Sequence, residues 1–202
     1  MRIIKMVGIS VILGIISLFI VSQIYINYST KDIETYKYKT IKSYQDFEIR
    51  LYQEALFSYV TIPKSSYKET SSKGFRILAG YIFGGNEKTE KIAMTSPVEM
   101  KMADSVTVKF MVPKSHNIDN LPRPNDSQIA FKTEPQKHLA ALTFGGFASD
   151  EIIRNKIEEL KKLLEEAEIK HSEEFSYMGY NPPYQLTNRR NEVVVEVDIS
   201  SI

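Results

Sequence analysis

The feature that most restricts the fold of this chain is an uncharged stretch near its N-terminus. No Asp, Glu, Lys or Arg occurs between Lys5 and Lys31, and residues 6–28 are almost wholly apolar. A helix needs about 20 such residues to cross the hydrocarbon core of a bilayer. A helix packed on a soluble core has one apolar face, whereas this segment has no polar face. We therefore predict that residues 1–28 form a membrane anchor outside the folded domain.

We interpret the segment as an uncleaved signal anchor; a cleaved signal peptide and a buried core helix are the alternatives. A cleavable signal has an apolar region of roughly 7–15 residues and ends at a small-x-small site. This run is longer, and residues 22–25 (SQIY) offer no such site. Because Arg2 and Lys5 precede the run, the positive-inside tendency keeps the N-terminus in the cytoplasm. The rest of the chain would then lie on the exocytoplasmic (periplasmic or extracellular) side, with the polar residues 29–43 as a tether.

The composition of the chain excludes several classes of protein. It has 202 residues and no cysteine, so disulfide frameworks, thiolate zinc sites and iron–sulfur ligation are ruled out. Lys and Arg number 26 against 25 Asp and Glu, a formal net charge of +1. This balance argues against a strongly basic nucleic-acid-binding protein, so we expect no nucleic-acid partner.

The chain from residue 44 onward shows the same order of secondary structure twice, strand-strand-helix-strand-strand. In the first half, alternating apolar residues and a helical apolar face predict elements over 47–52, 56–62, 66–82, 92–102 and 106–112. In the second half the corresponding elements are predicted over 129–133, 138–147, 149–170, 177–180 and 193–199. Each half is too small to be stable easily by itself. We therefore predict one α+β domain over 44–202, with halves of about 44–113 and 128–200, built as a strongly curved antiparallel sheet or barrel with two helices packed outside.

No catalytic or metal-binding set is recognisable in the sequence. The histidines, His116, His138 and His171, form no H-x-x-x-H pair, and the chain has no nucleophile elbow and no phosphate-binding glycine loop. Arg189 and Arg190 could bind a carboxylate or phosphate. Neighbouring residues on a strand point to opposite faces, so a structural pair is the favoured interpretation.

Several segments together resemble the SOUL haem-binding family, in the family's order and over about residues 44–199. These segments are Glu48–Tyr52 (EIRLY), Phe75–Asn86, Lys91–Val98 (KIAMTSPV), Phe144–Phe147 (FGGF), Tyr180–Pro183 (YNPP) and Arg189–Val193 (RRNEV). The resemblance implies a distorted antiparallel β-barrel with two flanking helices and an internal pseudo-twofold repeat. It also implies haem or a related tetrapyrrole as the ligand.

The resemblance further implies an exposed apolar groove between the first helix of the domain and the loop before the last strand. The cofactor-binding residues that it suggests are Ser72, Phe75, Arg76, Leu78, Ala79, Ile82, Pro183, Tyr184 and Leu186. No histidine falls on these segments, so axial ligation by histidine is not expected, and Tyr184 is the one conceivable phenolate ligand.

The hypothesis is therefore a non-catalytic binder of haem or another tetrapyrrole, anchored in a membrane through residues 6–28. The alternatives are a module that binds small hydrophobic or cationic molecules broadly, similar to the ligand domains of multidrug-sensing regulators, a hydrolase on that fold, or an envelope protein that binds a peptide in the groove. A buried acid with a neighbouring tyrosine would be typical of the hydrolase.

Overall fold

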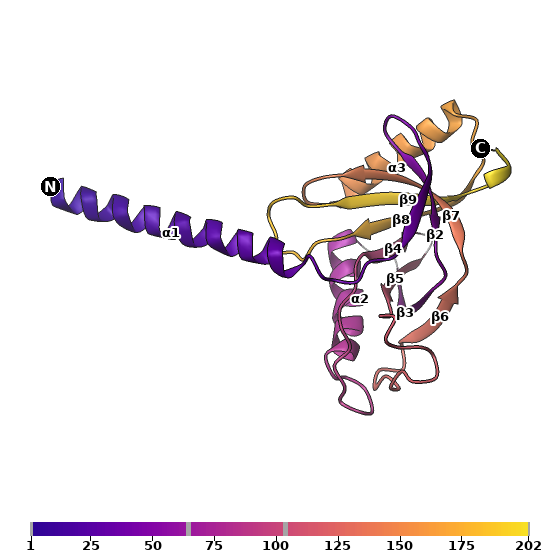
Figure 1. Ribbon diagram of the computed structural model, residues 1–202, viewed down its shortest axis with the longest axis horizontal. Helices are drawn as coiled ribbons and strands as arrows, with labels where there is room; N and C mark the ends of the chain where they lie inside the picture. Colours follow the sequence, from indigo (N-terminus) through magenta and orange to yellow (C-terminus); the bar gives the residue numbers. More distant parts are fainter. Residues whose placement is uncertain (1, 64–65, 103–104, 202) are drawn as a thin grey trace.

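A long N-terminal helix extends away from a single folded body (Figure 1). The computed structural model describes residues 2–63, 66–102 and 105–201. The helix, α1 (Arg2–Ser29), contains the described segment that is long and apolar enough to cross a membrane, Ile12–Ser29. Among the described residues of that window only Gln23 is buried, so α1 as a whole is not a core helix.

One antiparallel sheet forms the folded body, and among the described residues it has nine strands in the order β1-β2-β7-β9-β8-β4-β5-β3-β6. The edge strand β1 (Tyr38–Ser43) precedes the first half, whose strands are β2 (Glu48–Tyr52), β3 (Ala55–Pro63), β4 (Val98–Met102) and β5 (Ser105–Met111). Those of the second half are β6 (Ala130–Glu134), β7 (Lys137–Phe144), β8 (His171–Gly179) and β9 (Asn191–Val197). The sheet curls into a half-barrel, which confirms the α+β fold with a distorted antiparallel barrel (Figure 1).

The two halves are interlocked by their first strands. β2 pairs with β7 of the second half, whereas β6 pairs with β3 of the first half. The remaining strands of each half stay together, because β3 pairs with β5 and β7 pairs with β9. This exchange explains why neither half is an independent unit, as their small size predicts.

Two helices cover one face of this sheet, one from each half. α2 (Tyr67–Ile82) packs on β3 and β5, and α3 (Asp150–Glu166) packs on β7, β8 and β9. Both begin as the sequence predicts: the Ser66 hydroxyl accepts a bond from Glu69 N, and the Ser149 hydroxyl accepts one from Ile152 N. A short 3-10 helix, η1 (Ile199–Ser201), follows the last strand. The expected repeat of strand-strand-helix-strand-strand is therefore present.

The structure differs from the sequence-based elements in three places. The strand expected over 177–180 is β8, which begins six residues earlier, at His171. The second part of the expected tether, residues 38–43, forms the edge strand β1, whose side chains are almost all exposed. Because neither face of β1 is buried, its sequence carries no apolar alternation. The strand expected over residues 92–102 begins only at Val98, directly after Pro97, which has no amide hydrogen to donate to a ladder.

Candidate functional site

The outer surface of α2 carries three of the residues suggested for ligand binding. Ser72, Phe75 and Arg76 are exposed, although the Phe75 ring also packs edge-on against Phe110, with ring centroids 5.3 Å apart. Among the described residues, no carboxylate lies within ion-pairing distance of Arg76 or of the adjacent Lys73. This surface therefore combines a half-anchored aromatic ring with cations that are free to pair with a carboxylate.

The other suggested residues of α2 point toward the sheet. Leu78, Ala79 and Ile82 are all buried in the core between the helix and the strands. They orient the helix by their packing, and burial leaves them almost no surface for a ligand outside the helix. Of the suggested helix residues, only Ser72, Phe75 and Arg76 can contact such a ligand while α2 stays packed.

The loop between β8 and β9, residues 180–190, carries the remaining suggested residues. Pro183, Tyr184 and Leu186 are exposed. Arg189 holds the loop in shape, because its guanidinium donates to the carbonyls of Pro182 at 2.8 Å and Gln185 at 2.6 Å. The loop is therefore an ordered surface that presents three apolar or amphipathic side chains, and Arg189 has a structural role.

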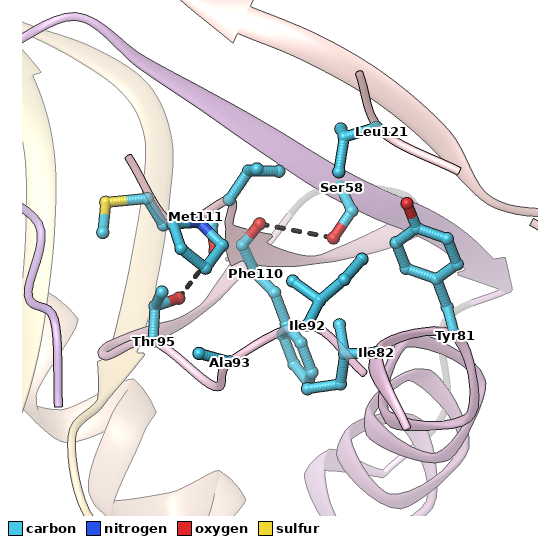
Figure 2. Close-up of a pocket in the computed structure, with 11 residues that line it drawn as sticks. Ser58, Tyr81, Ile82, Ile92, Ala93, Thr95, Phe110, Met111 and Leu121 are labelled. Atoms are coloured by element: carbon cyan, nitrogen blue, oxygen red, sulfur yellow. Dashed lines mark hydrogen bonds between the residues drawn. The ribbon is translucent and has the colours of Figure 1, made fainter. Parts of the chain in front are cut away.

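A small pocket lies at the C-terminal end of α2 (Figure 2). It is lined by Ser58, Tyr81, Ile82, Ile92, Ala93, Thr95, Phe110, Met111, Val112, Pro113 and Leu121. Its polar groups are already paired: the Thr95 hydroxyl donates to the Met111 carbonyl at 2.6 Å, and the Tyr81 hydroxyl donates to the Pro122 carbonyl at 2.9 Å. The cavity volume of about 10 Å³ holds roughly one water molecule. A ligand of drug size or larger needs several hundred Å³, so this pocket does not fit a tetrapyrrole.

The face of the sheet without helices buries a group of charged residues that we call the arginine cluster: Arg50, Glu192, Arg190 and the hydroxyl of Tyr180. Glu192 is fully buried; it accepts from Arg50 at 2.8 Å, from Arg190 at 2.7 Å and from Tyr180 at 2.7 Å. Burial disfavours the charged carboxylate, but Arg50 and Arg190 outweigh this effect and lower the pKa of Glu192. Arg190 therefore balances a buried charge, in agreement with the structural interpretation of the pair.

A second group on the same face, the lysine cluster, contains Lys109, Glu99, Glu134 and Lys137. The Lys109 ammonium lies 3.0 Å from Glu99 Oε1 and 2.6 Å from Glu134 Oε1, and Lys137 also pairs with Glu134. Burial opposes ionisation of Glu134, but the two lysines prevail and lower its pKa from 4.5 to about 2. Sequence reasoning missed both clusters. Charged residues at buried positions of strands β2, β5, β6 and β9 were the signal that could have revealed them.

The chemistry available at these places differs. The lysine cluster is mostly buried and balanced in charge. The arginine cluster places two arginines on one fully buried carboxylate, and of these arginines only Arg190 has a partly exposed side chain. The outer face of α2 and the loop 180–190 are open. Among the described residues, no group of three or more His, Asp or Glu could hold a metal ion. The histidines lie in the loop after β5, on β7 and at the start of β8. None is on α2 or on the loop 180–190. The exposed side chains of α2 and of the loop 180–190 therefore offer apolar and cationic groups, and no histidine, to a ligand.

Comparison with known proteins indicates the kind of ligand. The profile of the SOUL heme-binding protein family matches residues 33–196. Heme-binding protein 2 from Homo sapiens is 30% identical over 156 residues, which cover 73% of this chain and 76% of that protein. Heme-binding protein 2 from Mus musculus is 29% identical with the same coverage, and heme-binding protein 1 from Xenopus laevis is 28% identical over 155 residues, covering 73% of this chain and 81% of that protein.

Solved structures share the fold at low sequence identity. The EcmrR C-terminal domain matches with a TM-score of 0.60 and 11% identity, covering 80% of this chain and 98% of that one. A hydrolase from Listeria innocua matches with a TM-score of 0.55 and 9% identity, covering 78% and 94%. These similarities concern the fold alone, whereas the family profile covers the sheet and both of its helices. The chain therefore belongs to the SOUL haem-binding protein family, and this membership supports haem as its ligand.

Proposed function

We propose that this chain binds haem or a related tetrapyrrole, without catalysis, on the outer surface of α2 beside the loop 180–190. We further propose that α1 anchors the chain in a membrane, with the N-terminus in the cytoplasm and the folded domain on the exocytoplasmic side. The observation that carries the first proposal is the family membership, joined to an open surface with Phe75 and Arg76. The uncharged run of α1, whose apolar side chains over Ile12–Ser29 are not buried against the domain, supports the second.

The exposed residues of α2 and of the loop 180–190 offer more contacts to the ring and the carboxylates of a tetrapyrrole than to its iron. Phe75, Tyr184 and Leu186 can cover its flat apolar face, and Arg76 can pair with a carboxylate side chain of the ring. No histidine lies on either segment, and among their described tyrosines only Tyr184 is exposed, which makes it the conceivable iron ligand there. We therefore expect recognition through the ring and its carboxylates, so that metal-free protoporphyrin IX binds within about threefold of haem, less than about 0.7 kcal/mol apart.

A non-catalytic role is supported by the state of the acid that could serve a hydrolase. Glu192 and Tyr180 form the expected pair of a buried acid and a tyrosine, with 2.7 Å between their oxygens. The carboxylate is fully buried and ion-paired with Arg50 and Arg190. Such a group has no access to a substrate and no free oxygen to act as a base.

Absorption titrations of the full chain in detergent test the binding proposal. Phe75→Glu should weaken haem binding at least tenfold, because it puts a charge beneath the apolar ring. Ile152→Glu is the matched control: Ile152 lies on α3 and is 39% exposed, against 40% for Phe75. Equal affinity of the two variants would overturn the assignment to α2, and saturable binding of cationic dyes with none of haem would favour the broad-specificity alternative.

A second comparison tests the role given to Arg76. Arg76→Gln should weaken protoporphyrin IX binding several-fold and leave its dimethyl ester unaffected, since the ester has no carboxylate to pair with. Arg154→Gln on the exposed side of α3 is the control and should change neither affinity. If Arg76→Gln weakened acid and ester alike, the residue would contribute packing and not charge.

A further inference from the structure

The last turns of α1 are attached to the loop 180–190 by side-chain amides. Gln23 donates to the Tyr184 carbonyl at 3.4 Å and accepts from the Leu186 amide at 2.9 Å. One turn later, Asn27 accepts from the Gln185 side chain at 2.9 Å and donates to the Thr187 hydroxyl at 3.3 Å. Gln23 is buried by these contacts, whereas its helix neighbours on both sides are exposed.

These bonds fix the height of the loop along the helix. Gln23 lies six residues before the end of α1 at Ser29, which at 1.5 Å per residue is about 9 Å. The loop therefore runs alongside the last turns of the apolar helix instead of stopping at its end. In a bilayer, an unpaired amide at this depth is costly, and here the loop supplies partners to Gln23 and Asn27.

The side chains that the loop turns outward suit the boundary between lipid and water. Tyr184 is 62% exposed and Leu186 is 45% exposed, although both are large. The neighbouring loop after β7 adds Phe147, which is 52% exposed and stacks beneath the Arg189 guanidinium at 4.4 Å. Arg189 also donates to the Gly146 carbonyl, so it joins the two loops into one surface. Exposed tyrosine, leucine and phenylalanine beside the end of a membrane helix are typical of an interfacial contact.

We propose that the outward side chains of Tyr184, Leu186 and Phe147 insert into the headgroup region of the bilayer that α1 crosses. The proposal rests on the proposed membrane anchor, and its partner is the lipid surface itself. Tyr184 and Leu186 would exchange their lipid contacts for the ring of a bound tetrapyrrole, so an apolar ligand dissolved in the bilayer would reach the proposed site without crossing water.

The chain contains no tryptophan, so single tryptophans can report depth without interference. Tyr184→Trp and Leu186→Trp are made in the full chain and reconstituted in phosphatidylcholine vesicles with brominated acyl chains, which quench nearby indole rings. We expect at least half of their emission to be quenched, with a blue shift of about 10 nm. Ile118→Trp is the control: Ile118 is 56% exposed in the loop between β5 and β6, away from α1 (Figure 1).

Two further variants separate the possible failures. Phe19→Trp, in the middle of the apolar window, should be quenched if α1 spans the bilayer. If it is quenched while Tyr184→Trp and Leu186→Trp behave like Ile118→Trp, the interfacial loop is refuted and the anchor stands. If Phe19→Trp is not quenched, the anchor fails and this proposal fails with it, while haem titration of the unmodified chain judges ligand binding independently.

The hydrogen bonds of Gln23 can be tested in the same system. Adding Gln23→Leu to the Tyr184→Trp chain should reduce the quenching of the indole by about half, since the loop loses two of its bonds to α1. Ser22→Leu is the matched control, because the Ser22 hydroxyl bonds only within the helix, to the Phe19 carbonyl. Equal quenching in both variants would contradict the role of Gln23 in holding the loop at the lipid surface.

Discussion

The two buried ionic clusters each join one half of the domain to the other, at equivalent positions of the repeat and with opposite charges. The first strand of each half contributes one member, Arg50 from β2 and Glu134 from β6. The last strand contributes the other member, Glu192 from β9 and Lys109 from β5. A cation in one half therefore stands where an anion stands in the other.

The sheet register makes this equivalence geometric. In each cluster the two charged residues come from different halves, flank a central strand and pair with positions on it that are four residues apart. On β7 these positions are Leu139 and Thr143, and on β3 they are Ala55 and Tyr59. The duplicated pairing thus fixes where a buried ion pair can form, while the sign of each member is free as long as the pair is balanced.

Each cluster has one central charged residue, Lys109 in the lysine cluster and Glu192 in the arginine cluster, and the two clusters differ in the partners of that residue. In the lysine cluster one cation, Lys109, serves two buried carboxylates, and only Glu134 has a second lysine. In the arginine cluster one carboxylate serves two arginines, of which Arg190 has a side chain 39% exposed. Removing the charge of Lys109 should therefore lower the free energy of unfolding more than removing the charge of Glu192.

Lys109→Met should give the largest effect, a loss of about 3–5 kcal/mol in the free energy of unfolding. It leaves Glu99 buried with no cation in contact and Glu134 with Lys137 alone. Denaturant unfolding of the full chain in detergent, followed by near-ultraviolet circular dichroism of the tyrosines, measures the loss. Lys101→Met is the control: Lys101 pairs with exposed Glu174, and such surface pairs contribute at most about 1 kcal/mol. Similar losses in both variants would contradict the special role of Lys109.

Glu192→Gln should cost less, about 2–3 kcal/mol. The amide keeps one acceptor for Tyr180, Arg50 retains its bond to Glu48 at 2.6 Å, and Arg190 is partly solvated. The same unfolding measurement applies, with Glu196→Gln on the exposed side of β9 as the control. A loss larger than that of Lys109→Met would reverse the proposed ranking of the two clusters.

The two helices provide a smaller contrast between the halves. Counted from its capping serine, Gly74 of α2 takes the place of Ile157 in α3. A Cβ added at Gly74 would lie 2.4 Å from Val108 Cγ2 and 2.8 Å from Val108 Cβ, closer than carbon atoms can pack. The glycine therefore lets α2 lie unusually close to the sheet, whereas α3 packs through a large aliphatic side chain.

Gly74→Ala should destabilise the chain by about 1–3 kcal/mol, the usual cost of overpacking. Gly80→Ala is the matched control on the same helix, because a Cβ there meets nothing within 4 Å. That variant should be stabilised by about 0.5–1 kcal/mol through helix propensity. The contrast would be broken if both substitutions changed the thermal midpoint in the same direction.

Much of this fold could be predicted from residue patterns because its helices and central strands each bury one face. The capping serines Ser66 and Ser149 and the alternation in β5 and β9 follow directly from that rule. The edge strand β1 could not be predicted, because its exposed side chains carry no alternation. The exchange of β2 and β6 between the halves was equally hidden, since pairing depends on contacts between residues far apart in the chain.

The candidate site was less accessible to sequence reasoning than the fold. A helical apolar face groups Phe75 with Leu78 and Ile82, but only the structure separates the exposed ring from the two buried side chains. The buried ion pairs were missed for a related reason: Arg50 and Glu192 are distant in sequence, and each looks like an ordinary charged residue of a half-exposed strand. Contacts across the sheet, not local patterns, decide both cases.

Acid titration should test the lysine cluster through the sign of a pH dependence. Lys109 and Lys137 lower the pKa of Glu134 from 4.5 to about 2, so the folded state binds fewer protons than the unfolded state in this range. The stability that Glu134 contributes is therefore present above pH 4.5 and is lost as the pH falls toward 2. Lys109→Met removes the largest cause of the lowered pKa of Glu134, so the stability of this variant should fall less than that of the wild type between pH 4.5 and pH 2. The difference in free energy of unfolding between the wild type and Lys109→Met should accordingly narrow on acidification. Lys101→Met is the control, and its free energy of unfolding should change with pH in parallel with that of the wild type. A difference between the wild type and Lys109→Met that stays constant from pH 5 to pH 2.5 would show that Lys109 acts by packing and not by its charge.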